Sequence, residues 1–505
     1  MKVRILACVL LITLCVCQMP VSALTVAVGT EVPLTQQVTS APQIETTNEI
    51  HPTENSAEIK LFSDTVTLAD SAAPLADGDV KTVILKGMIA MREEINISEY
   101  GITPNELHAI VQDLLYGSPM VFHLASSYQY STFSDNKVYA IYPGYTLNTS
   151  EYQSAMAFCE EQIEKILETS GARKAKNDLF KALLLHDYIA AHFEYDTTYQ
   201  IYDIYGMLKN GKAVCQGYAL LYKELLYRVG IESGYAHSAG MNHIWNLVKI
   251  DDEYYHVDVT WADPVTDRYS RVSHAYFLLS DEYIQTADPG QKHYGWTASD
   301  DIECKSTKYD YNTFTYAESS FVLCGDDLYF INYKQGKLCR YTGPYTKGEV
   351  LCDVSDYWMT KEQNGSYWPG TYSGLVAYGA NLYYNTADTL GMYNVITKQT
   401  HTITTLSGEE NQIIGMRMDT EGKLCYAVAP DPYTAVTSFL TYEIPPLHDS
   451  DINGDGVLNV EDLSCILCYL AGVDENPLSR PDANRDGILN VSDLNTVLVA
   501  LATAE

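Results

Sequence analysis

Basic residues are scarce in this sequence of 505 residues, which has 32 Lys and Arg against 65 Asp and Glu and a formal net charge of −33. Such an acidic surface repels polyanions, so we expect no nucleic-acid partner. Long apolar runs are also lacking, because the stretch Ile5–Val16 is shorter than the ~20 residues that a membrane-spanning helix needs. We therefore expect no membrane span.

Cysteine is sparse as well. Three of the 12 cysteines precede residue 18, in a stretch where Lys2 and Arg4 are followed by the apolar run and then by Val21-Ser22-Ala23. This arrangement is typical of a secretory signal peptide, which we place at residues 1–23. We therefore expect a secreted, extracellular protein. The nine cysteines that remain are too few, and odd in number, for a disulfide framework.

Composition divides the rest of the chain into segments. Residues 24–80 are rich in Thr, Ala, Pro, Ser and Glu without a regular apolar pattern, which predicts a flexible linker. Helical periodicity follows, and Thr103–Glu106 has the pattern of a helix N-terminal capping box. Residues 301–447 contain short Tyr-rich runs separated by turn residues, which predicts a β-rich accessory module with the geometry of a partial propeller. These runs lie around Leu328, Leu382 and Leu424.

The C-terminal segment contains a duplicated motif. The twelve residues Asp451–Asp462 recur 31 positions later as Asp482–Asp493. Calcium binds ~6–8 oxygen ligands, and a loop of this spacing supplies them from alternate side chains and one backbone carbonyl. The sequence therefore predicts two calcium ions. The expected ligands are Asp451, Asn453, Asp455, Val457 (carbonyl), Asn459 and Asp462 in the first loop, and Asp482, Asn484, Asp486, Ile488 (carbonyl), Asn490 and Asp493 in the second.

Two features separate this motif from calmodulin-like sensors: position 12 is Asp instead of Glu, and no helix-forming sequence precedes the first loop. With the duplication, the segment resembles the type I dockerin of cellulosome-type assemblies, and we assign residues 448–505 to this small all-α module. The resemblance implies binding to a cohesin module of a scaffold protein, hence association with a scaffold or cell surface. It also implies that loop positions 10 and 11 help to select the partner, here Val460, Glu461, Val491 and Ser492. A calcium-stabilised tail without a partner is the alternative.

Cys215 is a candidate nucleophile. Apolar residues follow it at helical spacing, namely Tyr218, Leu221, Tyr222, Leu225 and Val229. We therefore expect Cys215 in the first turn of a helix, where the backbone N–H groups and the helix dipole favour a thiolate.

A β-hairpin farther along the chain offers two more polar side chains. Residues 244–250 and 254–259 alternate between apolar and polar on either side of a two-residue turn. If Ile250 pairs with Glu253, Asp258 lies diagonal to His243 on the same face. The carboxylate could then orient the imidazole, and the imidazole could take the thiol proton. Other histidines compete for this place, namely His237, His256 and His274.

The local sequences around these three residues are Gly-x-x-x-Cys-Gln-Gly-Tyr-Ala, His-x-Trp-Asn and Asp-Val-Thr-Trp. Together they resemble the transglutaminase-like superfamily of papain-like fold. The resemblance implies that Cys215 is the nucleophile, His243 the base and acid, and Asp258 the orienting group. The Cys215 N–H is the expected oxyanion donor, and Gln216 is a weaker second. We assign residues 81–300 to this domain, with a helical N-terminal lobe, in a multidomain α+β chain.

The expected reaction is attack by the Cys215 thiolate on a carboxamide or peptide carbonyl, which gives a thioester. Water as acceptor makes a peptidase or deamidase, whereas a lysine amine makes a cross-linking enzyme; we favour hydrolysis of protein or peptide amides, without a cofactor for catalysis. The alternative is a catalytically silent adaptor in a polysaccharide-degrading multienzyme complex. A carbohydrate-active enzyme is less favoured, because we find no convincing paired-carboxylate motif.

Overall fold

The computed structural model describes residues 58–60, 65–67, 78–265, 267–286, 292–358, 370–407, 411–419, 422–432, 436, 438–445, 450–454, 457–473, 482–484 and 490–503. The predicted signal peptide, most of the predicted linker, and Asp455, Asp486 and Ile488 lie outside these residues. The chain forms two compact units, Met1–Glu161 with Asp203–Leu208 and Gln162–Tyr202 with Lys209–Glu505. In the described part of the chain, no helix has both the length and the apolar character needed to span a membrane.

The first unit contains a small antiparallel sheet with helices. Two short strands, β1 and β2, pair inside the segment predicted to be a linker. The main sheet has the order β3-β5-β4, and its core includes apolar residues of α2 and α3. The elements are β1 (Glu58–Lys60), β2 (Thr65–Thr67), α2 (Val80–Ile89), β3 (Ile95–Asn96), α3 (Pro104–Gly117), β4 (Leu124–Thr132), β5 (Val138–Tyr145) and α4 (Thr149–Thr169), whose last residues belong to the second unit.

The start of α3 confirms the predicted capping box. Thr103 is the N-cap, and its hydroxyl accepts from the Glu106 N–H at 3.4 Å. The Glu106 carboxylate accepts in return from the Thr103 N–H at 2.7 Å. Two N–H groups that the helix cannot satisfy itself are therefore paired, which fixes where α3 begins.

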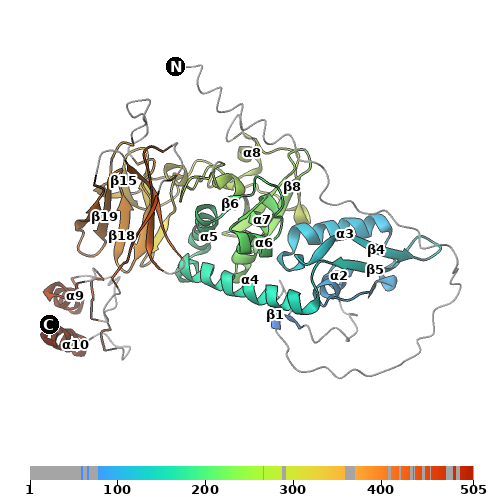
Figure 1. Cartoon of the computed structure of the whole chain (residues 1–505), viewed down its shortest axis with the longest axis horizontal. Coiled ribbons are helices and arrows are strands. Elements are labelled where there is room, and N and C mark those ends of the chain that lie inside the picture. Colours follow the sequence, from blue (N-terminus) through green and yellow to red (C-terminus); the bar gives the residue numbers. More distant parts are fainter. Residues whose placement is uncertain are drawn as a thin grey trace, which may run out of the picture. The chain divides into compact units, whose positions relative to one another are not determined.

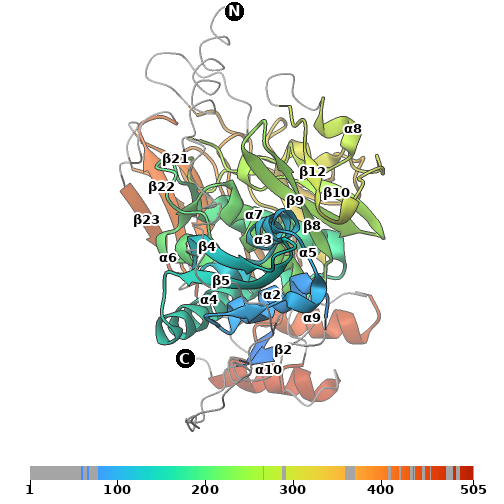
Figure 2. The same cartoon turned by 90° about the vertical axis from the view of Figure 1, so that its right-hand side faces the viewer.

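The second unit begins with a helix-and-sheet core. A five-stranded antiparallel sheet has the order β11-β10-β9-β8-β12, and α7 lies against β8 and β9 (Figure 2). The elements are α5 (Asp178–His192), β6 (Glu194–Tyr195), β7 (Lys212–Ala213), α7 (Cys215–Arg228), β8 (Ser233–Ser238), β9 (His243–Ile250), β10 (Glu253–Val257), β11 (Phe277–Leu279), α8 (Asp281–Ile284) and β12 (Thr297–Ala298). Helix α6 (Ile204–Asn210) belongs to the first unit up to Leu208.

The predicted hairpin and its register are confirmed. Strands β9 and β10 pair with Glu253 opposite Ile250. The two turn residues, Asp251 and Asp252, have φ values of 52° and 66°, as a tight two-residue hairpin requires. This turn sets the register of β9 and β10. It therefore also sets the position of Asp258, which directly follows β10.

Three antiparallel sheets follow the core (Figure 1). The predicted Tyr-rich runs each form the second strand of one sheet, while the partial propeller remains a prediction. Within β18, Leu382 and Tyr384 pack toward the first sheet and Tyr383 toward the third, as the two-residue period of a strand dictates. The strands are β13 (Val322–Cys324), β14 (Asp327–Asn332), β15 (Lys337–Arg340), β16 (Glu349–Asp353), β17 (Leu375–Tyr378), β18 (Asn381–Asn385), β19 (Thr389–Asn394), β20 (Thr400–Thr405), β21 (Gln412–Met418), β22 (Leu424–Ala429) and β23 (Ser438–Tyr442).

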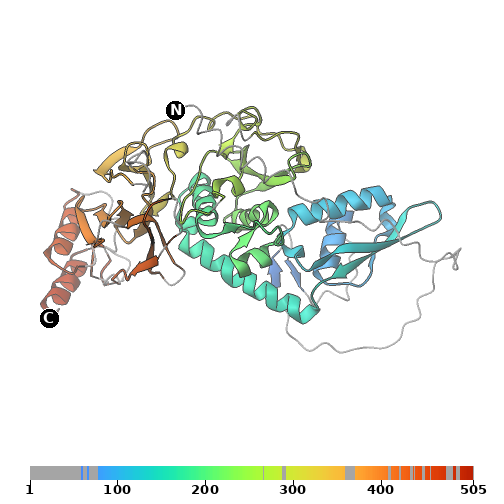
Figure 3. The same cartoon turned by 45° about the horizontal axis from the view of Figure 1, so that its top comes forward.

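Two helices lie side by side near the C-terminus, as the red ribbons of Figure 3 show. They are α9 (Val460–Leu470) and α10 (Val491–Thr503), one after each predicted calcium loop. Their shared core contains Ile452, Ile466, Ala483 and Val497. The predicted apolar helices are therefore present, and each carries an Asp in its first turn.

The compact units divide the chain differently from the predicted domains. Residues 78–161 belong to a unit apart from the core, whereas the β-sheets that follow residue 301 share a unit with it. Polar contacts across the predicted boundary at residue 300 are one physical reason. Asp187 of α5 accepts from the Phe321 N–H at 2.6 Å, and His274 lies 3.2 Å from the Ala317 carbonyl.

Candidate active site

Cys215 is the first residue of α7, as predicted, and its side chain is buried. Strand β7, which leads to it, pairs with β6, and the Val214 N–H donates to the Ile201 carbonyl at 2.9 Å. The N–H of Cys215 has no acceptor within the helix because of its position in the first turn. It can therefore donate to an oxyanion on a substrate bound to the thiol.

His243 and Asp258 meet as the hairpin register predicted. His243 is the first residue of β9 and Asp258 directly follows β10, and the Nε2 and Oδ2 atoms lie 2.7 Å apart. A hydrogen bond also joins His243 to the Cys215 thiol. Because Nε2 faces the carboxylate, Nδ1 is the nitrogen left for the sulfur. The structure thus brings the three predicted residues into one hydrogen-bonded line.

The electrostatics of this line favour an imidazolium. Burial alone would lower the pKa of His243, but the Asp258 charge and its hydrogen bond, with a contribution from Cys215, raise it to about 10. Burial also opposes the charged form of Asp258, yet His243 and His293 hold the pKa of that carboxyl well below its usual range. A cysteine beside a histidine that a carboxylate orients is the arrangement of a Cys-His nucleophile.

Two tryptophans fix the plane of the His243 ring. Trp245 and Trp261 stack against it with ring centroids 5.5 Å and 5.3 Å away and interplanar angles of 23° and 22°. The Asp258 carboxylate is held in turn by the Trp261 N–H, which donates to Oδ1 at 3.2 Å. The tryptophans of the two local motifs therefore position the imidazole and the carboxylate.

Two of the three competing histidines contact other carboxylates. His256 is buried, accepts from Trp245 Nε1 at 2.9 Å and faces Asp281 at 2.9 Å. His274 contacts Asp187 instead, at 2.9 Å. His237 lies in β8 and is half exposed.

The residue that sequence reasoning missed is His293. Its Nε2 lies 2.8 Å from Asp258 Oδ2, the same oxygen that His243 contacts. His293 follows Asp258 by 35 residues and has no motif around it. The residue type, in a chain with 12 histidines, was the only signal, and it was too weak to single this one out.

A loop rich in tyrosine lies next to the thiol. Burial raises the pKa of Tyr195 and of Tyr202, and the charge of Cys215 raises both further. Asp196 shapes this loop by accepting from the N–H groups of Gln200 and Ile201 at 2.8 Å and 3.0 Å. Sequence reasoning recognised the loop as polar and aromatic but did not connect it to the site. Gln216 is half buried in the first turn of α7, and its role in binding an oxyanion remains a prediction.

The predicted calcium loops share one local design. Asp462 is buried and accepts from Ile452, Asn453 and Asn459 N–H groups at 2.7, 3.2 and 2.8 Å. In the second loop, Asp493 is also buried and accepts from the N–H groups of Asn484 and Asn490 at 3.2 Å and 2.8 Å.

The chemistry of the first loop fits a hard cation. Asp451, Asn453 and Asp462 are all buried, and residues 424–473 include neither Lys nor Arg. Buried carboxylates need a compensating charge, and side-chain and carbonyl oxygens are the ligands that calcium prefers. The predicted partner-selecting residues Val460, Glu461, Val491 and Ser492 are all exposed at the starts of α9 and α10.

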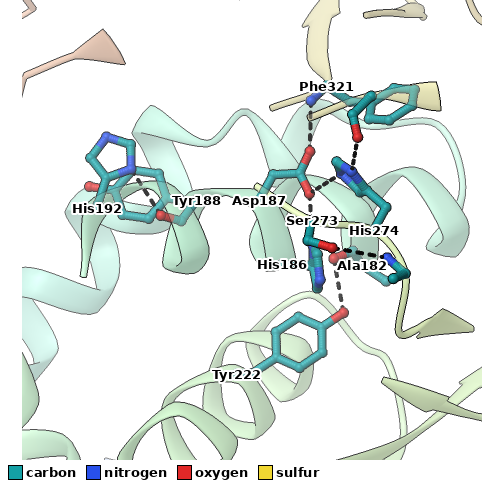
Figure 4. A network of polar contacts seen from close by, with 11 residues as sticks. Ala182, His186, Asp187, Tyr188, His192, Tyr222, Ser273, His274 and Phe321 are labelled. Carbon is teal, nitrogen blue, oxygen red and sulfur yellow. Dashed lines mark hydrogen bonds and ion pairs between the residues drawn. The ribbon is translucent and has the colours of Figure 1, made fainter. Parts of the chain in front are cut away.

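A second carboxylate in the core also holds two histidines (Figure 4). Asp187 Oδ1 lies 2.7 Å from His186 Nδ1 and 2.9 Å from His274 Nε2. Its Oδ2 accepts from the Phe321 N–H, and His274 Nδ1 faces the Ala317 carbonyl. Asp187 also lines a cavity of about 600 Å³, which Cys215 does not line.

Comparisons with known proteins found one family model and several similar structures. Residues 167–259 match the model of the transglutaminase-like superfamily. One similar solved structure is that of a TGase, which is 14% identical; the match covers 32% of this chain and 48% of that chain, with a TM-score of 0.20. Another is a protein of Cytophaga hutchinsonii provisionally described as a cysteine protease, which is 13% identical; the match covers 28% of this chain and 64% of that chain, with a TM-score of 0.18. The match thus spans under two thirds of each structure. No curated protein matches. The chain therefore contains a transglutaminase-like superfamily domain at residues 167–259, and Cys215, His243 and Asp258 all lie within it.

Proposed function

We propose that the protein is a secreted, thiol-dependent acyl-transfer enzyme that acts on protein or peptide amides. The observation that carries this proposal is the hydrogen-bonded line from Cys215 through His243 to Asp258. A superfamily match over residues 167–259 supports a thiol reaction of this kind.

The first half-reaction forms a thioester. The Cys215 thiolate attacks the carbonyl carbon, and the developing oxyanion accepts from the Cys215 N–H. The C–N bond then breaks, and the His243 imidazolium gives its Nδ1 proton to the leaving amine or ammonia. Asp258 stays ionised throughout and holds the imidazole in place by its contact with Nε2.

The second half-reaction returns the thiol to its starting state. His243, now neutral, takes a proton from water or from an amine as that nucleophile attacks the thioester. The C–S bond breaks and leaves the thiolate beside the imidazolium. Water gives an acid, by peptidase or deamidase action, and a lysine amine gives a cross-link. We favour water, because it needs no binding site of its own.

One experiment separates these outcomes. The full mature chain is incubated with reduced, carboxymethylated serum albumin and a biotinylated primary amine, and mass spectrometry reads cleavage, deamidation and amine incorporation together. We expect activity in at least one channel for wild type and none for Cys215→Ala. Cys425→Ala, at a half-buried thiol on β22, should behave like wild type. Equal signals from wild type and Cys215→Ala in all three channels would exclude the enzyme.

We further propose that the C-terminal segment docks onto a cohesin module through calcium-loaded loops. Its helices and the residues beside them carry exposed apolar side chains, and exposed apolar patches often mark interaction sites. These are Val457, Val460, Leu467, Leu470, Val473, Val491, Leu498 and Val499. The predicted loop oxygens would hold the ion, whose charge would offset the buried carboxylates. Loss of cohesin binding on chelation would support docking, whereas unchanged binding would exclude a calcium-dependent dock.

The alternative is an adaptor without catalysis, whose β-sheets bind a polymer while the C-terminal segment docks. The reactivity of the Cys215 thiol distinguishes the two proposals. An adaptor requires no activated sulfur, so its Cys215 would react no faster than the other cysteines.

A further inference from the structure

The second histidine on Asp258 is the least expected feature of the site. His293 is fully buried, and its Nε2 lies 2.8 Å from Oδ2. An ionised carboxylate can only accept, so the His293 proton sits on Nε2. The other ring nitrogen, Nδ1, is buried and has no hydrogen-bond partner. Burial lowers the pKa of His293, and the ring is therefore a neutral donor.

Packing alone does not explain a histidine at this position. Aromatic rings of Trp261, Trp245 and Tyr276 surround His293 at centroid distances of 4.2, 4.6 and 5.1 Å. A phenyl ring would fill this aromatic slot without leaving a buried nitrogen unpaired, which carries an energetic penalty. What the imidazole adds is one N–H directed at the carboxylate.

We propose that His293 is a positioning residue that holds Asp258 Oδ2 and limits how strongly this oxygen attracts the proton of His243. The inference rests on the proposed function. Two N–H groups share one oxygen, so each reduces the negative charge that the other meets. Without His293, Oδ2 would act on His243 alone, and the imidazolium would keep its proton to higher pH and give it up less readily to a leaving amine.

Other charged and titratable groups face this pair and must be allowed for. His243 is faced by Cys215, Asp258, His293 and His237, and His293 is faced by Asp258, His243 and His256. Apart from His293 itself, none of these groups is altered by a substitution at residue 293. A change in the proton affinity of His243 in such a variant therefore reports the lost N–H.

The test compares two variants that fill the same slot. His293→Phe keeps the aromatic packing and removes the donor, whereas His293→Gln offers an amide N–H near the place of Nε2. The readout is the rate at which iodoacetate alkylates Cys215, followed peptide by peptide from pH 5 to 11. This anion reacts fastest beside an imidazolium, so the rate falls as His243 loses its proton. Melting temperatures show that each variant is folded.

We expect the alkaline limb of the Cys215 profile to move up by about half a pH unit or more in His293→Phe and to stay near its wild-type position in His293→Gln. An unchanged or lowered limb in the Phe variant overturns the inference, and so does an equal shift in both variants. These results leave the acyl-transfer proposal standing. A Cys215 that reacts no faster than the other cysteines in wild type overturns both proposals at once.

Discussion

Two carboxylates in the core, Asp258 and Asp187, have similar histidine contacts, but the groups beyond those histidines differ. Each is buried, and each places one oxygen between two imidazoles. In each cluster one histidine has a buried nitrogen without a partner, namely Nδ1 of His293 and Nε2 of His186.

The remaining histidine of each cluster makes the difference. The second ring nitrogen of His243 faces a thiol, whereas the second ring nitrogen of His274 faces the Ala317 carbonyl. A carbonyl can only accept, so that chain of contacts ends in a fixed, structural bond. A thiol can give its proton away and attack. Of these two clusters, the one that Cys215 completes is therefore the candidate catalytic site.

The largest expected effect separates the clusters by activity. Asp258→Asn should lower amide processing by about 10⁴-fold, because the amide cannot stabilise the His243 imidazolium or fix its tautomer. Asp187→Asn should leave the rate per folded molecule unchanged. Rates measured by the mass-spectrometric assay, normalised to folded protein, check both. Equal losses in the two variants would mean that the clusters are not functionally distinct.

A second effect separates them by stability. Asp187→Asn should lower the melting temperature by roughly 6 °C or more, because losing the hydrogen bonds of a buried carboxylate costs about 3 kcal/mol. Asp187 also accepts from Phe321 and so joins α5 to the chain that enters β13. Calorimetry of Asp187→Asn and of the exposed control Asp178→Asn measures this. A melting temperature of Asp187→Asn like that of wild type would show that Asp187 does not stabilise the fold.

Stability against pH sharpens the contrast further. The folded pKa of His243, about 10, lies above the unfolded value of about 6.5. Its contribution is therefore complete below pH ~6.5 and is lost as the pH rises through about 10. The pKa of Asp187 is lowered: burial opposes this shift, but His274 and His186 outweigh it. The Asp187 contribution is present above pH ~3.9 and is lost as the pH falls below it.

Melting curves check this pH dependence. The difference in melting temperature between wild type and His243→Gln should shrink between pH 6.5 and 10. The difference for Asp187→Asn should shrink instead on acidification below pH 4. A His243→Gln difference that grows with pH would contradict the assigned imidazolium.

Calcium removal is expected to have the smallest effect on the difference between the Asp258 and Asp187 clusters. Chelation should lower the far-UV helical signal of α9 and α10 and raise the labelling of Cys465, which packs in their core, because metal binding contributes folding free energy to such loops. Cys215 labelling should not change. Asp462→Ala, lacking an expected ligand, should mimic chelation in the first loop. An unchanged spectrum after chelation would contradict the predicted loops.

How much the sequence could predict depends on how local the information is. Cys215 at a helix start and the His243–Asp258 pair follow from helical spacing and from one hairpin register, both readable over a few residues. His293 reaches Asp258 from 35 residues away by tertiary packing, which no local pattern encodes. Asp187 was missed for a related reason: α5 is buried on nearly all sides, so its polar residues carry no periodic signal. The Tyr-rich strands were predictable, but their division into three sheets depends on which faces pack.

The most direct test of the central claim is the reactivity of Cys215 toward iodoacetamide near neutral pH, read peptide by peptide against the eight other described cysteines, all of which are free thiols. Burial raises the pKa of Cys324 and Cys339 to about 12, so these thiols should react slowly. We expect Cys215 to be alkylated at least about 100-fold faster than they are, and we expect Asp258→Asn to remove most of this advantage. A Cys215 that reacts at their rate would contradict this expectation.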